Sequence, residues 1–324
     1  MRRRATAVLA LALLLGACAG DGGDAQVGQD PGPGSSIEEV EETTTTAKRL
    51  PAPSPYVPVA GEPVPEAKQR AADLVQAIGT YERGQGTVPA AQARVAALGP
   101  ATIADGAAPL LVPDAQATVE IVYPQLGGLT ATEASVMVVA RQRLLRDDEE
   151  TEVTRTIDVR LALEAGVWEP TSIASFGGEP PSAPAPSALG QAVLDNEAID
   201  LPDSSRWDIE AGIVDDRILQ LMLDLAATHR FGVVTLANGH PVNVFGTSRT
   251  SNHTRGRAVD IWSVDDQPVV LQRAVGGPLH ALVSRLLTET ELTEVGSPWD
   301  LDPVGRPSFT DTVHQDHLHL GFKR

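Results

Sequence analysis

The histidines of this 324-residue chain are concentrated near its C-terminus. Two of them, His317 and His319, are two positions apart and flank Leu318. On a β-strand, residues i and i+2 face the same side, so both imidazoles would point into one space if this region is extended. All seven histidines lie in the final part of the chain, at positions His229, His240, His253, His280, His314, His317 and His319.

The sequence SNHTRGRAVDIW, from Ser251 to Trp262, places a histidine seven residues before an aspartate. If residues 256 to 261 form a strand, His253 stands on the turn before it and Asp260 projects from one face. Taken by itself the stretch is ambiguous, because a glycine turn is also how a buried strand begins. With the C-terminal histidines, however, two imidazoles and one carboxylate would make a three-ligand zinc set whose fourth position is open, as in catalytic sites.

The ten residues from Ser251 to Asp260 match every fixed position of a Ser-x-His-x-x-Gly-x-Ala-x-Asp signature. This signature is similar to that of the zinc D-alanyl-D-alanine carboxypeptidases and L-alanyl-D-glutamate endopeptidases. The C-terminal His-x-His resembles the second motif of the wider group, which includes lysostaphin-type peptidases and the hedgehog signalling domain. The resemblance covers residues 188–324 and implies a small α+β zinc-peptidase domain. It also implies one Zn²⁺ ion held by His253, Asp260 and His319.

The same resemblance implies the catalytic residues. In these peptidases a carboxylate three positions before the last ligand acts as general base, and Asp316 stands there, where many relatives have Glu. Strand alternation alone favours His317 as the group that faces the metal, so Asp316 is expected as base and His317 as its partner. Arg249, whose position no motif fixes, is the candidate for binding substrate or the oxyanion, with a solvated arginine as the alternative. Ser251 is expected to orient substrate or a ligand, unless it only hydrogen-bonds its own turn.

Regular elements of a second α+β segment, residues 188–324, are expected to position these side chains. Asp215 or Asp216 is expected to cap a helix that runs to Thr228. His240 and His314 are expected to be ordinary satisfied histidines, with a place beside the metal as the alternative, and the other two histidines are assigned to structure. The remaining elements are predicted as strands at Phe231 to Leu236, Arg257 to Trp262 and Asp316 to Phe322, and a helix at about Pro278 to Thr290.

A separate α+β accessory domain is predicted for residues 65–176. Two helices, Pro65 to Tyr81 and Pro89 to Leu98, precede four Val-, Ile- and Thr-rich antiparallel strands. This element order resembles the cystatin-like and nuclear-transport-factor-like cone folds with a curved sheet, which carries no functional implication. Alternation in residues 154–163 predicts a sheet packed on one side. We expect a spacer or binding module, joined to the second segment by a Pro-rich linker at residues 177–187.

The N-terminus has the pattern of an exported lipoprotein. Three arginines and an apolar run predict a signal peptide at residues 1–17, and the small residues around Cys18 resemble the bacterial lipoprotein processing box. Cys18 is therefore the expected lipidation site, and the chain would be anchored to the outer face of the cytoplasmic membrane; the alternative is an ordinary secretory cleavage with Cys18 nearby by chance. Residues 18–64, rich in Gly, Pro, Ser, Thr and acids, are predicted to be a disordered tether. A single cysteine permits no disulfide within the chain.

The net charge of −18 and pI near 4.7 argue against nucleic acid as a partner. The expected function is zinc-dependent hydrolysis of peptide bonds in peptidoglycan stem peptides, as a carboxypeptidase or endopeptidase of D,D or L,D specificity. The alternative is a non-catalytic, zinc-stabilised module that binds the cell wall, or an envelope scaffold. Protein partners are not indicated by the sequence.

Overall fold

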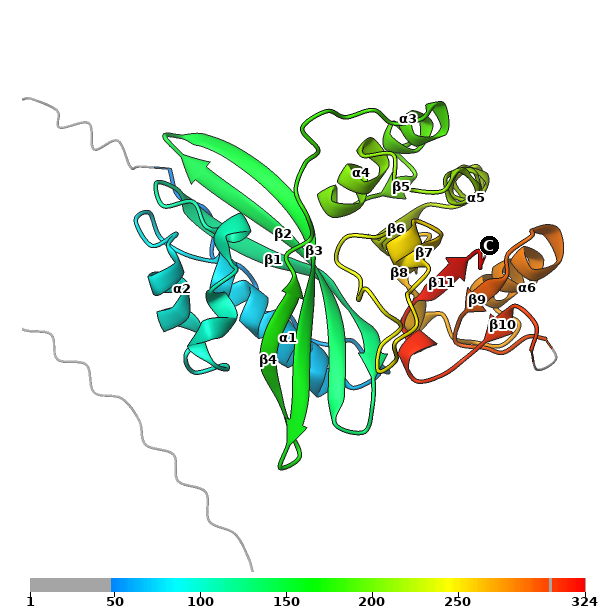
Figure 1. The fold of residues 1–324 in the computed structure, drawn as a ribbon, viewed down its shortest axis with the longest axis horizontal. Helices are drawn as coiled ribbons and strands as arrows, with labels where there is room; N and C mark the ends of the chain where they lie inside the picture. The colour runs from blue at the N-terminus through cyan, green and yellow to red at the C-terminus, as the bar shows by residue number, and fades with distance from the viewer. Residues whose placement is uncertain (1–47, 303–304, 324) are drawn as a thin grey trace, which may run out of the picture. The chain divides into compact units, whose positions relative to one another are not determined.

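The computed structural model describes residues 48–302 and 305–323. These residues have a mixed α+β structure, which confirms the predicted α+β class (Figure 1). The predicted signal peptide, the lipidation site Cys18 and the predicted tether up to residue 47 lie outside the described residues. None of the helices in the described part of the chain is long and apolar enough to span a membrane.

The elements follow one another in two groups, called here the first segment (residues 65–176) and the second segment (from residue 188). The first contains α1 (Pro65–Gly79), α2 (Val88–Val95), η1 (Ala101–Ala104), η2 (Ala108–Leu110), β1 (Gln116–Leu129), β2 (Glu133–Arg146), β3 (Glu149–Glu164) and β4 (Val167–Ser175). The second contains α3 (Ala188–Leu194), β5 (Ile199–Asp200), α4 (Asp203–Glu210), α5 (Asp216–Ala226), β6 (Phe231–Thr235), η3 (His253–Arg255), β7 (Ala258–Val264), β8 (Gln267–Pro268), η4 (Val269–Leu271), α6 (Pro278–Glu289), β9 (Glu294–Gly296), β10 (Ser308–Phe309), η5 (Val313–Gln315) and β11 (Leu318–Gly321).

The first segment is a four-stranded antiparallel sheet in the order β1-β2-β3-β4, with α1 packed against it (Figure 1). The two helices and four strands confirm the elements predicted here. Pro65 starts α1, where its fixed φ suits the first turn. The helix then buries a stripe at helical spacing against the sheet: Ala67, Lys68, Ala71, Leu74, Val75 and Ile78.

The first sheet is covered on both faces along part of its length, whereas alternation predicts one covered face. In β2 the seven residues from 134 to 140 are consecutively buried, as in strands that contact neighbours on both sides. The second face packs on the second segment: Tyr123 of β1 and Met137 of β2 share a small core with Val234 of β6. The ring of Tyr123 also stacks on Trp262 of β7, with centroids 4.9 Å apart.

The second segment is a seven-stranded mixed sheet in the order β10-β9-β11-β7-β6-β5, with β8 added beside β7. The predicted strands and the helix α6 are present, and α5 begins at the predicted cap, where Asp215 accepts a hydrogen bond from Arg217 N. Strand β11 pairs antiparallel with β7, and in this register His319 lies directly opposite Asp260. The register therefore brings two of the predicted ligands together.

Residues 48–64, the end of the predicted tether, lie against the first segment. Leu50 is buried and its N–H donates to Gln116 Oε1 at 2.9 Å. Glu62 is also buried, and Tyr56 packs against the hydrophobic core of the first segment. Composition gives no sign of these contacts, because a Pro-rich stretch with few apolar residues buries only isolated side chains on a surface that is formed elsewhere.

Candidate metal centre

The turn at the start of β7 is built around a glycine. His253 begins the short 3₁₀ turn η3, and Gly256 ends it with a φ of +67°. A Cβ on Gly256 would overlap the carbonyl oxygen of Ile213, so no other residue fits the turn without displacement. Asp260 follows on β7 with its side chain buried. The glycine thus lets the chain reverse tightly enough for His253 to face Asp260.

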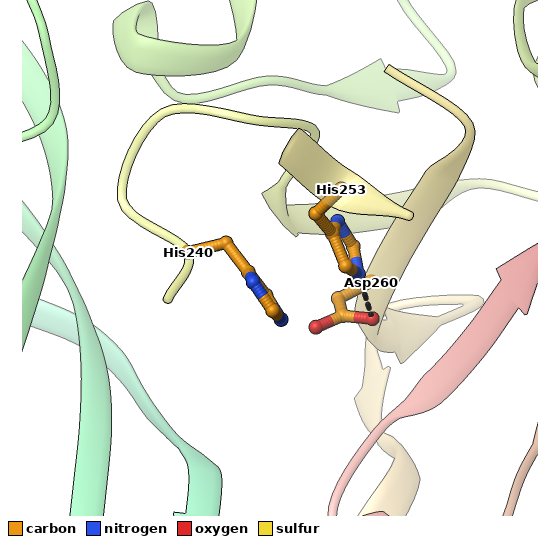
Figure 2. A group of neighbouring side chains, drawn as sticks. All are labelled: His240, His253 and Asp260. Atoms are coloured by element: carbon orange, nitrogen blue, oxygen red, sulfur yellow. Dashed lines mark hydrogen bonds and ion pairs between the residues drawn. The ribbon is translucent and has the colours of Figure 1, made fainter. Parts of the chain in front are cut away.

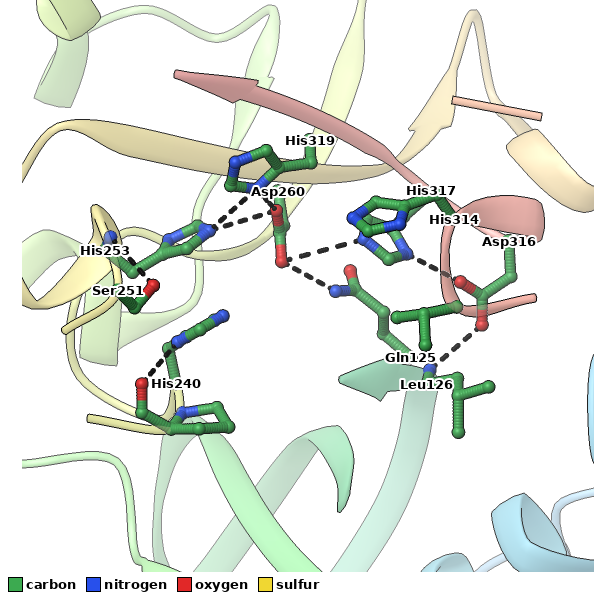
Figure 3. Close-up of polar contacts among 12 residues, drawn as sticks. Gln125, Leu126, His240, Ser251, His253, Asp260, His314, Asp316, His317 and His319 are labelled. Carbon is green, nitrogen blue, oxygen red and sulfur yellow. Dashed lines mark hydrogen bonds and ion pairs between the residues drawn. The ribbon is translucent and has the colours of Figure 1, made fainter. Parts of the chain in front are cut away.

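Three ligand atoms converge at this turn (Figure 3). Nε2 of His253 lies 3.1 Å from Oδ1 of Asp260 and 3.1 Å from Nδ1 of His319. Nδ1 of His319 lies 2.9 Å from the same Oδ1. The structure therefore brings together all three residues predicted as metal ligands. His253 and Asp260 are buried, and His319 is nearly so, with its side chain 13% exposed.

The other ring nitrogen of His253 is fixed by the backbone. Nδ1 lies 2.7 Å from the carbonyl oxygen of Leu236 and donates a hydrogen bond to it, so Nε2 is the ring nitrogen that is turned toward Asp260 and His319. The chain that follows Leu236 is held in turn by the buried carboxylate of Asp208, which accepts hydrogen bonds from the N–H groups of Ala237 and Asn238 at 2.8 and 2.9 Å. These contacts support the backbone that fixes the His253 ring.

A fourth group, His240, lies beside the cluster (Figure 2). Its ring stacks on His253 with centroids 4.0 Å apart. His240, His253 and Asp260 each offer a ligand atom within 4.8 Å of the other two, a group that is able to hold a metal ion. The sequence left His240 open between a satisfied histidine and a place beside the metal, and the structure places it at the cluster.

The electrostatics of the cluster couple the imidazoles to the carboxylates. Burial alone would raise the pKa of Asp260, but the charges of His253 and His317, with hydrogen bonds from the ring nitrogens, hold its pKa well below the ordinary value. Burial alone would lower the pKa of His319, but its contacts with Asp260 and Glu294 raise that pKa to about 9. The cluster thus attracts positive charge, which in the metal-free protein is a proton.

Asp316 and His317 form a buried pair next to the cluster. Nδ1 of His317 lies 2.6 Å from Oδ1 of Asp316, and Nε2 of His317 lies 3.9 Å from Oδ2 of Asp260. The other oxygen of Asp316 accepts a hydrogen bond from Leu126 N at 2.9 Å and forms an ion pair with Lys68. His317 and His319 thus both face Asp260, as strand alternation predicts. Asp316 faces the first segment.

Ser251 and Arg249 have different surroundings. The Ser251 hydroxyl is buried and accepts a hydrogen bond from His253 N at 3.2 Å, which is the turn contact considered as an alternative for this residue. The Arg249 side chain is 65% exposed, and its nearest acidic partner is Glu294, at 3.9 Å. Ser251 therefore shapes the turn that carries His253, while Arg249 stands at the rim.

The cluster opens on a pocket of about 330 Å³ that is lined by both segments. Gln125 and Gly127 of β1 form part of one wall, and the second segment contributes residues that include His240, Arg249, His314 and His317. Asp316 is not among the described residues that line it. His314 is held by Asp311, with 2.7 Å between its Nδ1 and the carboxylate.

Two site residues of the first segment were not predicted. Gln125 sits in a strand and nothing in its local sequence distinguishes it. Lys68 did carry a signal, because it lies three and seven positions before Ala71 and Val75 and so falls on the apolar stripe of α1. A lysine on a buried stripe needs an acidic partner, and here it has Glu62 and Asp316.

Comparisons with known proteins identify no family. No family model matches the chain, and no curated protein or solved structure matches it.

Proposed function

We propose that this protein binds one Zn²⁺ ion through His253, Asp260 and His319 and hydrolyses a peptide bond in peptidoglycan stem peptides. The observation that carries the proposal is the convergence of Nε2, Oδ1 and Nδ1 of these residues within 2.9 to 3.1 Å of one another. Tetrahedral zinc with ligand bonds of about 2.0 to 2.1 Å needs ligand atoms about 3.3 Å apart, so the donor set fits with a small outward movement.

A bound zinc ion supplies a Lewis acid and lowers the pKa of the water molecule it holds, which is what peptide hydrolysis at neutral pH requires. The chain's own residues then have separate tasks. Asp316 holds the proton on Nδ1 of His317, which leaves Nε2 free to accept a proton near Asp260. We therefore assign proton transfer to His317 and give Asp316, the base implied by the resemblance, the task of orienting it. Arg249 at the rim is the group available to a substrate carboxylate.

The substrate class rests on the Ser251 to Asp260 signature and on the size of the pocket. A cavity of about 330 Å³ lies at the lower end of the range typical for small-molecule sites, about 300 to 1,000 Å³, and suits a short peptide end. Export and a lipid anchor at Cys18 would place the pocket beside the cell wall.

A second candidate is a zinc-stabilised module that binds wall peptides without cleaving them. The position of Asp316 favours this module. Its Oδ1 contacts His317, its Oδ2 contacts Leu126 N and Lys68, and Asp316 does not line the pocket. If His317 does not transfer protons, the same geometry serves binding alone.

The test is incubation of the purified zinc-loaded protein with muropeptides, with products followed by mass spectrometry. Cleavage by the wild type, and its loss in His317→Ala with zinc content retained, is the expected result. His229→Ala is the matched control, since that ring contacts Asp265 at 2.9 Å rather than the cluster. Intact muropeptides after incubation with a fully zinc-loaded wild type would exclude the hydrolase and leave the binding module.

A further inference from the structure

Gln125 connects the first segment to the candidate metal centre. Its side chain is fully buried, and its Nε2 donates a hydrogen bond to Oδ2 of Asp260 at 2.7 Å (Figure 3). The other oxygen of that carboxylate, Oδ1, faces His253 and His319. The two oxygens of Asp260 are therefore divided, one toward the amide of β1 and one toward the ligand cluster.

The contact with Asp260 decides which way the amide of Gln125 points. Reversal of the amide would set Oε1 against a carboxylate oxygen, and two acceptors repel each other. In the observed orientation Oε1 is buried and has no hydrogen-bond partner among the described residues. Buried polar atoms without partners are uncommon and call for an explanation. Here the unpaired oxygen is the consequence of directing the N–H group at Asp260.

The strand that carries Gln125 is itself fixed to the second segment. The next residue, Leu126, donates its N–H to Asp316 Oδ2 at 2.9 Å. Gly128, three positions after Gln125, has no side chain, and a Cβ there would overlap the side chain of Phe245, which lines the pocket. β1 is thus seated closely enough for one amide to hold a residue of β7.

We propose that Gln125 is a positioning residue for the metal centre, which holds Asp260 so that only Oδ1 is presented to the ion. The centre is then complete only when both segments are present. This inference rests on the zinc site of the proposed function, but it does not depend on peptide hydrolysis.

The experiment measures zinc affinity in the full chain, with Zn²⁺ alone as probe and a chromophoric chelator as competitor. Gln125→Met removes the hydrogen-bond donor at similar side-chain size, and Gln125→Asn keeps an amide on a side chain that is too short to reach Asp260.

Gln142→Met is the matched control, because Gln142 is also a buried glutamine of the same sheet but donates to the carbonyls of Gly79 and Leu110. Loss of an outer hydrogen bond to a ligand typically weakens metal binding about 10- to 100-fold, and we expect this for both Gln125 variants and no change for the control.

A spectroscopic readout separates positioning from general destabilisation. With Co²⁺ in place of zinc, the visible absorption bands should change in both Gln125 variants, because Asp260 becomes free to present its second oxygen, and should be unchanged in Gln142→Met. Equal zinc affinity and equal spectra in the Gln125 variants and the control would overturn the inference. A wild type that binds zinc without cleaving muropeptides would remove the proposed hydrolase and leave this inference standing. A wild type that binds no zinc would remove both.

Discussion

Nδ1 of His319 lies 2.9 Å from Oδ1 of Asp260 because the two residues are directly opposite each other on β11 and β7. Two of the three candidate ligands therefore come from adjacent strands inside a sheet, and only His253 comes from a turn. A shift of one residue in the pairing of the strands would turn His319 to the other face, so the register is part of the site.

Removal of any one ligand should abolish tight zinc binding. We expect His253→Ala, Asp260→Ala and His319→Ala each to lower zinc affinity by more than the roughly 10- to 100-fold typical of residues that only support a ligand. Metal analysis after gel filtration, with about one zinc per chain expected for the wild type, measures this. The control is His280→Ala, whose ring packs edge-on against Trp299 with centroids 5.1 Å apart. A full zinc content in Asp260→Ala would show that the ligand set is wrong.

The candidate ligands His253 and Asp260 could be singled out from the sequence because the pattern that marks them is local. His253 and Asp260 lie within one turn and one strand, whereas His319 is implied as the third ligand only by the resemblance, since alternation along the last strand does not choose between His317 and His319. The longer helices and strands were also predictable, since their apolar periodicity extends over many residues. The strands β5, β8, β9 and β10 have two or three residues each, too few to show a period.

The contacts between the segments could not be predicted in the same way. Gln125 and Asp260 are separated by 135 positions, and no local pattern indicates that they meet. The ion pair between Lys68 and Asp316 was missed for the same reason, because Lys68 is on α1 and Asp316 lies near the C-terminus.

Replacement of Lys68 should destabilise the fold strongly. Its ammonium forms ion pairs with Glu62 and Asp316, and all three side chains are fully buried. Lys68→Met leaves two buried carboxylates without a cation, and breaking a buried pair in this way costs about 3 to 5 kcal/mol of unfolding free energy. Urea unfolding at pH 7 measures the loss.

Two further variants test the cause. The double variant Lys68→Met with Glu62→Gln should be more stable than Lys68→Met alone, because one unpaired charge is removed. Arg70→Met breaks a partly exposed pair between α1 and Glu169 of β4, and such pairs contribute about 1 kcal/mol or less. If Lys68→Met is no more harmful than Arg70→Met, the buried ion pairs do not stabilise this fold.

Asp208, which supports the chain behind His253, should make stability depend on pH. Burial raises its pKa to about 6, against the hydrogen bonds from Asn238 and Ala237 that lower it, from an ordinary value near 3.8. Between these two pH values the folded protein keeps a proton that the unfolded chain has released. Lowering the pH from 7 to 4 should therefore stabilise the fold through this residue, by on the order of 3 kcal/mol for a shift of this size.

The difference in unfolding free energy between the wild type and Asp208→Asn isolates this contribution, because all other titrating groups are common to both proteins. Urea unfolding at half-unit steps of pH should show the difference moving in favour of the wild type as the pH falls through about 6. A difference that stays flat between pH 7 and pH 4 would mean that Asp208 is ionised in the folded protein throughout this range.

Gly256→Ala should weaken both the fold and the metal centre. A side chain at this position must adopt a φ of +67° and would overlap the carbonyl oxygen of Ile213, so the turn that carries His253 has to move. Gly84→Ala is the matched control, since Gly84 has a φ of +86° but a Cβ added there would meet nothing within 4 Å. The control measures the backbone cost of alanine alone, about 1 kcal/mol.

Thermal unfolding and zinc titration of the two variants should show a larger loss of stability in Gly256→Ala, and a loss of zinc affinity in that variant only. Equal losses of stability with zinc binding intact would mean that the close approach to Ile213 does not hold His253 in place.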